Sequence, residues 1–144
     1  MRRECKNSFN KTFYVVEHSQ ELDIVDTLWY GYASPTDLRQ AMEAGLEVLE
    51  QTNCAYKLND NTQFTGPWKE AVKWLEKEWL PRAMKAGLCC LAHVANADSL
   101  AEESGKAMEI SLIGRKLIYR MFHSRTEALA WLKTCQVEKV CVEQ

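Results

Sequence analysis

The residues whose types and spacing could do chemistry gather between Cys54 and Gly87 of this 144-residue chain. The stretch CAYKLND has the composition of a buried strand, and it is followed by the polar NTQFTG and the helical PWKEAVKWLEKEWLPRAMKAG. In open α/β sheets, ligands and partners bind outside the carboxyl ends of the strands. The order strand, loop, helix therefore predicts a functional edge here.

Thr65 and Gly66 stand at the expected start of that helix, directly before Pro67. Free backbone N–H groups and the helix dipole favour an anion at a helix start, and they would equally hold a phosphoryl group on Thr65. Thr62 is the next nearest hydroxyl. The alternative is that Thr65 only caps the helix, which threonine does well. The two hypotheses are a switch or anion-binding position at Thr62, Thr65 and Gly66, or an ordinary N-cap.

A second group of polar residues follows two strands that we expect to be neighbours. Turns after strands favour such residues even without a site, so recognition is one of two interpretations. Together with two tryptophans of the intervening helix, they make up the predicted partner or ligand edge: Asp60, Asn61, Trp68, Trp74, Asn96, Asp98 and Ser99.

The tryptophans of this helix allow two interpretations. Trp68, Val72, Leu75 and Trp79 recur at helical spacing, which predicts a stripe that packs in the core. Trp74 lies off that stripe, so we expect it to be partly exposed and suited to a protein interface. Alternatively, the three tryptophans line a pocket for an apolar or lipid ligand, because aromatic side chains dominate such sites.

Signatures of catalysis, metal binding and nucleotide binding are missing from the sequence. His18, His93 and His123 are scattered and form no H-E-x-x-H motif, and the glycines form neither G-x-G-x-x-G nor a P-loop. His93 lies in an apolar stretch, where a hydrogen-bonded core histidine is expected. We therefore expect no metal, no cofactor and no enzymatic activity.

The composition of the chain narrows the possible functional classes and cellular locations of the protein. With 18 basic and 20 acidic side chains and an isoelectric point near 5.9, the chain lacks the basic stripe of a nucleic-acid binder. No apolar run is long enough for a membrane span, and MRRECKNSFNK lacks the apolar stretch of a signal peptide. The six cysteines form no C-x-x-C pair and are expected to be reduced. These features predict a soluble cytoplasmic protein.

Periodicity predicts the order β-β-α-β-α-β-α-β-α in a single α/β domain. The strands are expected at 12–17, 23–32, 55–59, 88–95 and 117–122. The helices are expected to start at Pro67 and directly after Ser34, Ser99 and Ser124, with Gly114 as a C-cap and a break at Pro81. Strands that alternate with helices predict a mixed, mostly parallel five-stranded sheet with four flanking helices. Residues 1–11 would be an N-terminal extension, 12–135 the domain and 136–144 a tail.

This order and its motifs resemble the STAS superfamily, in particular the stand-alone domains similar to the bacterial anti-anti-sigma factors. The resemblance covers about Thr12 to Lys133. It rests on WYGY at the end of the hairpin, on LND…GPW…W…W, on PRAMKAGL and on FHSRTEALAWL. These relatives fold as a mixed sheet flanked by helices, and many are known only as STAS or Sec14-like domains.

In anti-anti-sigma factors, a partner kinase phosphorylates a serine at the start of the helix after strand three, and the unphosphorylated form binds that kinase. The D-S-S-G motif of that switch is missing, and the matching residues are Asp60 to Gly66. The resemblance implies a non-enzymatic regulatory domain that binds a protein partner, with Thr65 or Thr62 as the switch. The Sec14-like label instead implies a small-ligand, nucleotide or lipid-binding domain. A homodimer through the WYGY hairpin is a further expectation.

Overall fold

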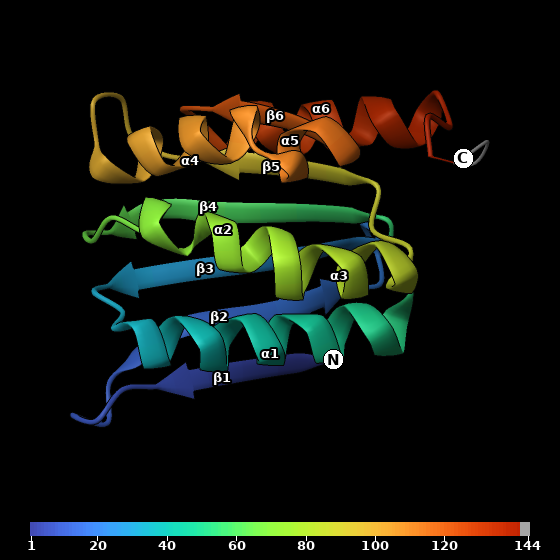
Figure 1. The fold of residues 1–144 in the computed structure, drawn as a ribbon. Coiled ribbons are helices and arrows are strands. Elements are labelled where there is room, and N and C mark those ends of the chain that lie inside the picture. The colour runs from blue at the N-terminus through green and yellow to red at the C-terminus, as the bar shows by residue number, and fades with distance from the viewer. Residues whose placement is uncertain (142–144) are drawn as a thin grey trace.

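The computed structural model describes residues 1–141, which form one six-stranded mixed sheet in the order β1-β2-β3-β4-β5-β6 (Figure 1). The first three strands are antiparallel neighbours, and the pairs from β3 to β6 are parallel. The strands are β1 (Arg2–Lys6), β2 (Thr12–Ser19), β3 (Ile24–Gly31), β4 (Tyr56–Phe64), β5 (Cys90–Val94) and β6 (Ile118–Phe122).

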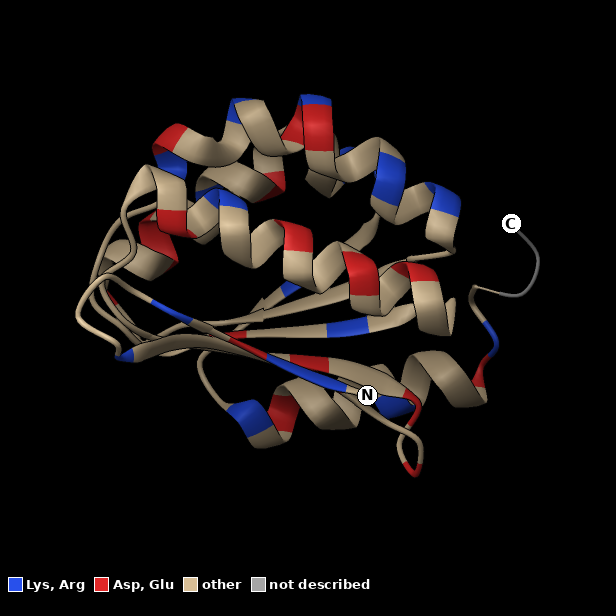
Figure 2. Cartoon of the chain, turned by 90° about the horizontal axis from the view of Figure 1, so that it is seen from below, with Lys and Arg blue, Asp and Glu red and all other residues tan. Residues whose placement is uncertain are grey.

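Helices cover both faces of this sheet (Figures 1 and 2). Only α6 packs on one face, over β4, β5 and β6, as far as the described residues show, and the other helices stack on the opposite face. The helices are α1 (Pro35–Thr52), a composite crossover helix made of η1 (Lys69–Ala71), α2 (Val72–Trp74), η2 (Leu75–Trp79) and α3 (Leu80–Ala86), then α4 (Leu100–Ile110), α5 (Leu112–Lys116) and α6 (Arg125–Val137). None of the helices within residues 1–141 combines the length and apolarity that a membrane span requires.

The prediction of five strands is wrong, because β1 lies within the expected N-terminal extension. It pairs antiparallel with β2, with Arg3 opposite Val16. Cys5 is the only buried residue of this strand, so its sequence shows no apolar alternation that would reveal it. Charged side chains are typical of edge strands, where they discourage pairing with another chain.

The expected dimer edge is wrong as well, since the WYGY hairpin offers no free strand. β3 lies inside the sheet, hydrogen-bonded to β2 on one side and to β4 on the other. The edges of the described sheet are β1 and β6.

Helix α1 begins where the sequence predicts. The Ser34 hydroxyl accepts a hydrogen bond from the Asp37 backbone N–H, the Asp37 carboxylate accepts one from the Ser34 backbone N–H, and Pro35 occupies the first turn. Asn53 ends the helix in the left-handed conformation, which asparagine tolerates.

The crossover helix begins later than predicted and is irregular. It starts as a 3-10 turn at Lys69 with Trp68 at the N-cap and no side-chain cap, so Thr65 is not its capping residue. A π segment, Leu75–Trp79, precedes Pro81, and the Leu80 N–H donates to the Leu75 carbonyl. Proline has no N–H for the normal helical bond, so the change of helix type falls at the predicted break.

Strand β4 is five residues longer at its C-terminal end than expected, running to Phe64 rather than Asn59. Leu28 faces Asp60 and Tyr30 faces Gln63, so two residues of β4 lie opposite one of β3. This β-bulge absorbs Asn61 and Thr62, which keeps the polar stretch in the sheet instead of in a loop.

Gly114 is not a C-cap. Helix α4 ends at Ile110, Ser111 caps a second short helix, and Gly114 lies inside that helix, α5. A Cβ at Gly114 would lie 2.0 Å from the Glu109 carbonyl oxygen, so the close return of α5 onto α4 requires glycine. This return adds a fifth helical unit to the four that were predicted.

The expectation of six reduced cysteines is also wrong. Cys89 and Cys141 form a disulfide with Cα atoms 5.9 Å apart, which ties the segment after α6 to the start of β5. The expected tail therefore has structure up to residue 141, while its last three residues lie outside the described part of the chain. Disulfides are rare in cytosolic proteins, so the cytoplasmic location stays a prediction.

Replacing Cys141 with serine tests the contribution of this cross-link. Its two cysteines are 52 residues apart, and closing a loop of that length stabilises a protein by about 2–4 kcal/mol. We expect Cys141→Ser to lower the free energy of unfolding by about that amount in urea titrations without reductant. With dithiothreitol the wild type and the variant should differ little, and an equal gap in both conditions would contradict the disulfide.

Candidate functional site

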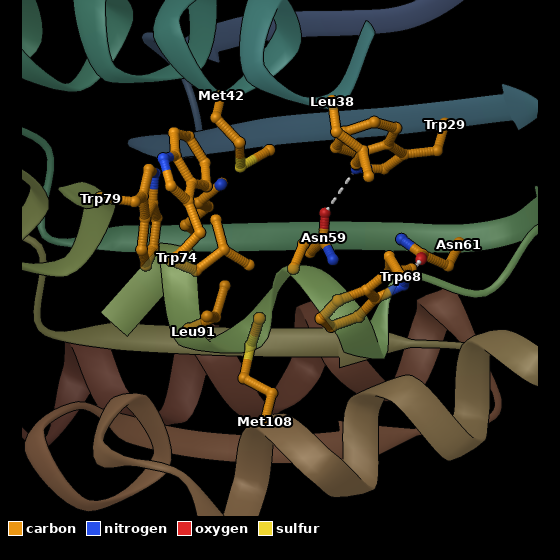
Figure 3. Close-up of a pocket in the computed structure, with 13 residues that line it drawn as sticks. Trp29, Leu38, Met42, Asn59, Asn61, Trp68, Trp74, Trp79, Leu91 and Met108 are labelled. Atoms are coloured by element: carbon orange, nitrogen blue, oxygen red, sulfur yellow. Dashed lines mark hydrogen bonds between the residues drawn. The ribbon is translucent and has the colours of Figure 1, made fainter. Parts of the chain in front are cut away.

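A cavity of about 40 Å³ lies between the sheet and the helices on the face opposite α6 (Figure 3). It is large enough for a few waters or one end of a small molecule, since a water needs about 10–15 Å³. Met42 reaches it from α1 and Met108 from α4. Four tryptophans contribute most of its aromatic surface, namely Trp29, Trp68, Trp74 and Trp79.

The floor of the cavity is one face of β4. Successive side chains of a strand alternate between the two faces, so Lys57, Asn59 and Asn61 share the side covered by α1, the crossover helix and α4. Leu58 and Asp60 lie on the other side. A central strand with polar groups at alternate positions departs from the apolar runs typical of buried parallel strands. This departure singles out β4 among the parallel strands of the sheet.

Asn59 joins three neighbouring strands by hydrogen bonds. Its Oδ1 accepts from Trp29 Nε1 at 2.8 Å and from Thr27 Oγ1 at 3.1 Å, both on β3. Its Nδ2 lies 3.1 Å from His93 Nδ1 on β5. Because an indole N–H only donates, this network sets the orientation of the Asn59 amide. The amide in turn holds the Trp29 ring against the cavity.

His93 is fully buried behind Asn59, and its second ring nitrogen, Nε2, lies 3.2 Å from the Ala101 carbonyl. A carbonyl can only accept, so Nε2 carries the proton and Nδ1 accepts from Asn59. Burial lowers the pKa of this imidazole to about 4, which keeps the ring neutral at pH 7. A Cβ at Gly105 would lie 2.5 Å from the His93 ring, so α4 needs glycine at this contact. The expectation of a hydrogen-bonded core histidine matches this geometry.

The indole N–H groups of Trp68 and Trp79 differ in whether they have a hydrogen-bond acceptor. Trp68 Nε1 donates to Asn61 Oδ1 at 2.7 Å, and the Trp68 backbone N–H donates to Ser104. Trp79 is buried, and its Nε1 has no acceptor among the described residues. The Nδ2 of Asn61 is likewise buried without a partner there. Buried donors without acceptors are rare in folded proteins, so each needs an explanation.

Lys57 is the most unusual residue of the site. Only 3% of its surface is exposed, and its ammonium lies 4.9 Å from the centroid of the Trp79 ring. No carboxylate pairs with it in the described part of the chain. Burial lowers the pKa of the amine to about 8, since removing water disfavours the charged form. Lysine is almost never fully buried without a partner, which singles this position out.

The cavity continues outward into a groove of about 360 Å³ between the start of α1 and the crossover helix. The two share Leu38, Trp68, Ala71 and Trp74 in their walls. Trp74 is half-buried, as predicted, and its ring lies 4.8 Å from the guanidinium of Arg39 on the groove rim. The groove is therefore a mostly apolar entrance with charges at its margin.

The expected edge residues do not form one site. Asp60 turns to the opposite face of the sheet, where it is buried and pairs with Arg125 at 3.2 Å. Asp60 Oδ1 also accepts from Thr62 Oγ1 at 2.7 Å. The Asn96 amide donates to the Thr62 carbonyl, so the ends of β4 and β5 do meet as expected. That contact ties the ends of the two strands together.

The remaining predicted residues lie outside the cavity. Thr65 is exposed, and its backbone N–H donates to the Gly31 carbonyl at 2.7 Å. Gly66 is buried next to Tyr32, and Asp98 is exposed. Ser99 caps α4 through the Glu102 N–H. The structure thus brings Asn61, Trp68 and Trp74 together in the cavity and separates them from the threonines.

Two groups of described side chains have the spacing for a metal ion. One consists of Cys89, Cys90 and Cys141, in which the disulfide already joins two of the three sulfurs. In the other, His18 Nε2 lies 3.0 Å from Asp23, with Cys54 beside them. Their ligand atoms are thus largely engaged with one another, and neither group adjoins the cavity.

Lys57, Asn59 and Trp29 belong to the site although the sequence alone did not single them out. A signal for the first two was present, because YKLNDN places polar side chains at every second position of a strand expected to be central. The structure shows that these positions face a tryptophan wall.

Comparison with known proteins yields no relative. The chain matches no known family model, no curated protein and no solved structure.

Lys57→Met tests the cost of the buried ammonium. In the wild type, the unfolded chain binds a proton on Lys57 more readily than the folded chain between pH 8 and 10.5, so folding stability from this group rises with pH there. The variant should lack that rise. At pH 7 its free energy of unfolding should be about 2–3 kcal/mol higher than that of the wild type. Urea titrations across pH 7–10.5 measure both effects.

Lys77→Met is the matched control, because Lys77 is a lysine exposed on the crossover helix. Its stability should follow the wild type at every pH. A Lys57→Met curve parallel to that of the wild type would contradict a lowered pKa for the buried amine.

Proposed function

We propose that this protein is a small-molecule-binding domain whose ligand enters the tryptophan-lined cavity through the groove beside α1. The observation that carries the proposal is a cavity with aromatic walls, where the lining residues Asn61 and Trp79 each carry a buried donor that finds no acceptor within residues 1–141. Ligand sites are typically apolar clefts with a few polar groups that orient the ligand. This is the ligand-binding alternative among the functions that the sequence allows.

The cavity and its network support this function together. Asn59 and His93 are hydrogen-bonded to each other, which fixes the side chains at the floor of the cavity. This bond leaves the donors of Asn61 and Trp79 available to a ligand. The apolar entrance and the π segment of the crossover helix add support, since π segments are frequent at functional sites.

Ala71→Leu tests the binding function by filling the shared wall of cavity and groove. The probes are indole and 2-naphthamide, two neutral aromatic molecules, measured by saturation-transfer NMR and isothermal titration calorimetry. We expect both to bind the wild type and to lose roughly tenfold or more in affinity for the variant, because the added carbons occupy their space. Overpacking should cost about 1–3 kcal/mol of stability, which leaves the fold intact for the measurement.

Ala130→Leu is the matched control, because Ala130 is exposed on α6 at the opposite face of the sheet. Its probe affinities should equal those of the wild type. If the probes bind Ala71→Leu as well as the wild type, or bind neither protein, the cavity is not the binding site.

A regulatory protein-interaction domain is the second candidate, and one observation favours it. The side chain of Thr65 is exposed directly after β4, whereas the Thr62 hydroxyl is engaged with Asp60. A kinase could therefore reach Thr65 far more readily. Such a switch would not use a helix N-terminus, since the crossover helix starts four residues later, at Lys69.

The intact mass of protein purified from its own host tests this candidate. A phosphate-sized increment that maps to Thr65 and is absent from Thr65→Val would support the switch, and a phosphate on Thr62 would reverse the assignment. An unmodified chain under all growth conditions would remove the phosphoswitch and leave the cavity as the functional site.

A further inference from the structure

Two donors at one end of the cavity define the chemistry that the ligand must bring. The Lys57 ammonium lies over the face of Trp79, and among residues 1–141 no carboxylate pairs with it and no acceptor meets the Trp79 N–H. A buried cation without an anion is costly, and a buried donor without an acceptor adds to that cost. Both costs are relieved by one group that is anionic and accepts two hydrogen bonds.

A carboxylate fits this requirement better than other anions. It carries one negative charge and two acceptor oxygens, which match one ammonium and one indole N–H. Phosphate carries more charge and is usually bound by several donors or by a helix N-terminus. The residues that line the cavity include one cation only, Lys57, which suits a single negative charge better. A volume of about 40 Å³ also suits a small head group.

The walls define the remainder of the ligand. Beyond Lys57 the cavity is bounded by Met42, Leu75, Leu91 and the tryptophans, and the outer groove adds Pro35 and Pro67. Such surfaces favour a flat apolar body, because aromatic rings stack on indoles and bury their surface efficiently. The Asn61 Nδ2, buried beside Trp68 and without an acceptor in the described part of the chain, can serve a polar substituent on that body.

We infer that the ligand is a small aromatic carboxylic acid whose carboxylate pairs with Lys57 and whose ring lies among the tryptophans. This inference rests on the proposed binding function. It assigns Lys57 as the residue that selects acids over neutral molecules of the same shape.

Two probes of equal shape test the selection, 2-naphthoate and its neutral amide 2-naphthamide, titrated by calorimetry at pH 7. The wild type should bind 2-naphthoate at least roughly tenfold more tightly, as expected for one charged hydrogen bond. Lys57→Met should bind the two probes within about twofold of each other, because only the charge has been removed. Arg39→Met is the matched control at the groove rim, and it should keep the preference for the acid.

The pH dependence gives a second measurement that needs no variant. Raising the pH from 7 to 10 should weaken 2-naphthoate binding as the Lys57 ammonium loses its proton, while 2-naphthamide binding stays constant. The other charged groups near the cavity are Arg39 and Glu70 on the rim, and His93 behind Asn59 stays neutral throughout this range. The change therefore reports on Lys57.

Each other outcome overturns the inference in a distinct way. Equal affinities of the wild type for the two probes, both lost in Ala71→Leu, would leave the binding function standing and remove the carboxylate. A preference lost in Arg39→Met but kept in Lys57→Met would move the anion to the rim. Failure of both probes to bind would remove the binding function itself.

Discussion

The architecture of this site depends on Asn59, a polar side chain that the fold places in the middle of a covered sheet. Burying an amide without partners costs several kcal/mol, so the neighbouring strands must supply them. β3 provides the Trp29 and Thr27 donors, and β5 provides the His93 acceptor. The bonds hold the three strands in one register and hold the Trp29 ring in place. The Trp29 wall and the floor of the cavity follow from this one requirement.

Lys57, next to this hydrogen-bond network, lowers the stability of the folded state. The position is surrounded by apolar side chains, and a methionine there would pack without a charge to desolvate. A folded state that keeps an unpaired ammonium is less stable than it would otherwise be. Such local costs are typical of binding sites, where a group is held ready for a partner that the chain itself does not contain.

Much of the fold was predictable because its signals are local. Three such signals depend on residues within a few positions of one another. They are the capping box at Ser34 and Asp37, the apolar stripe from Trp68 to Trp79 and the change of helix type near Pro81. β1 and the end of β4 were missed because their polar residues show no apolar alternation, and only pairing with β2 and β3 makes them strands. The disulfide joins two cysteines 52 residues apart, a distance over which spacing carries no information.

The sequence by itself determined the α/β class, the alternation of strands and helices and the region in which the site lies. Only the tertiary structure decided which face of β4 matters. Asp60 and Asn61 are neighbours in the chain, yet one pairs with Arg125 under α6 and the other with Trp68 under the opposite helices. The physical reason is that a strand sends successive side chains to opposite sides, and the helix that covers each side is chosen by the packing of the whole sheet.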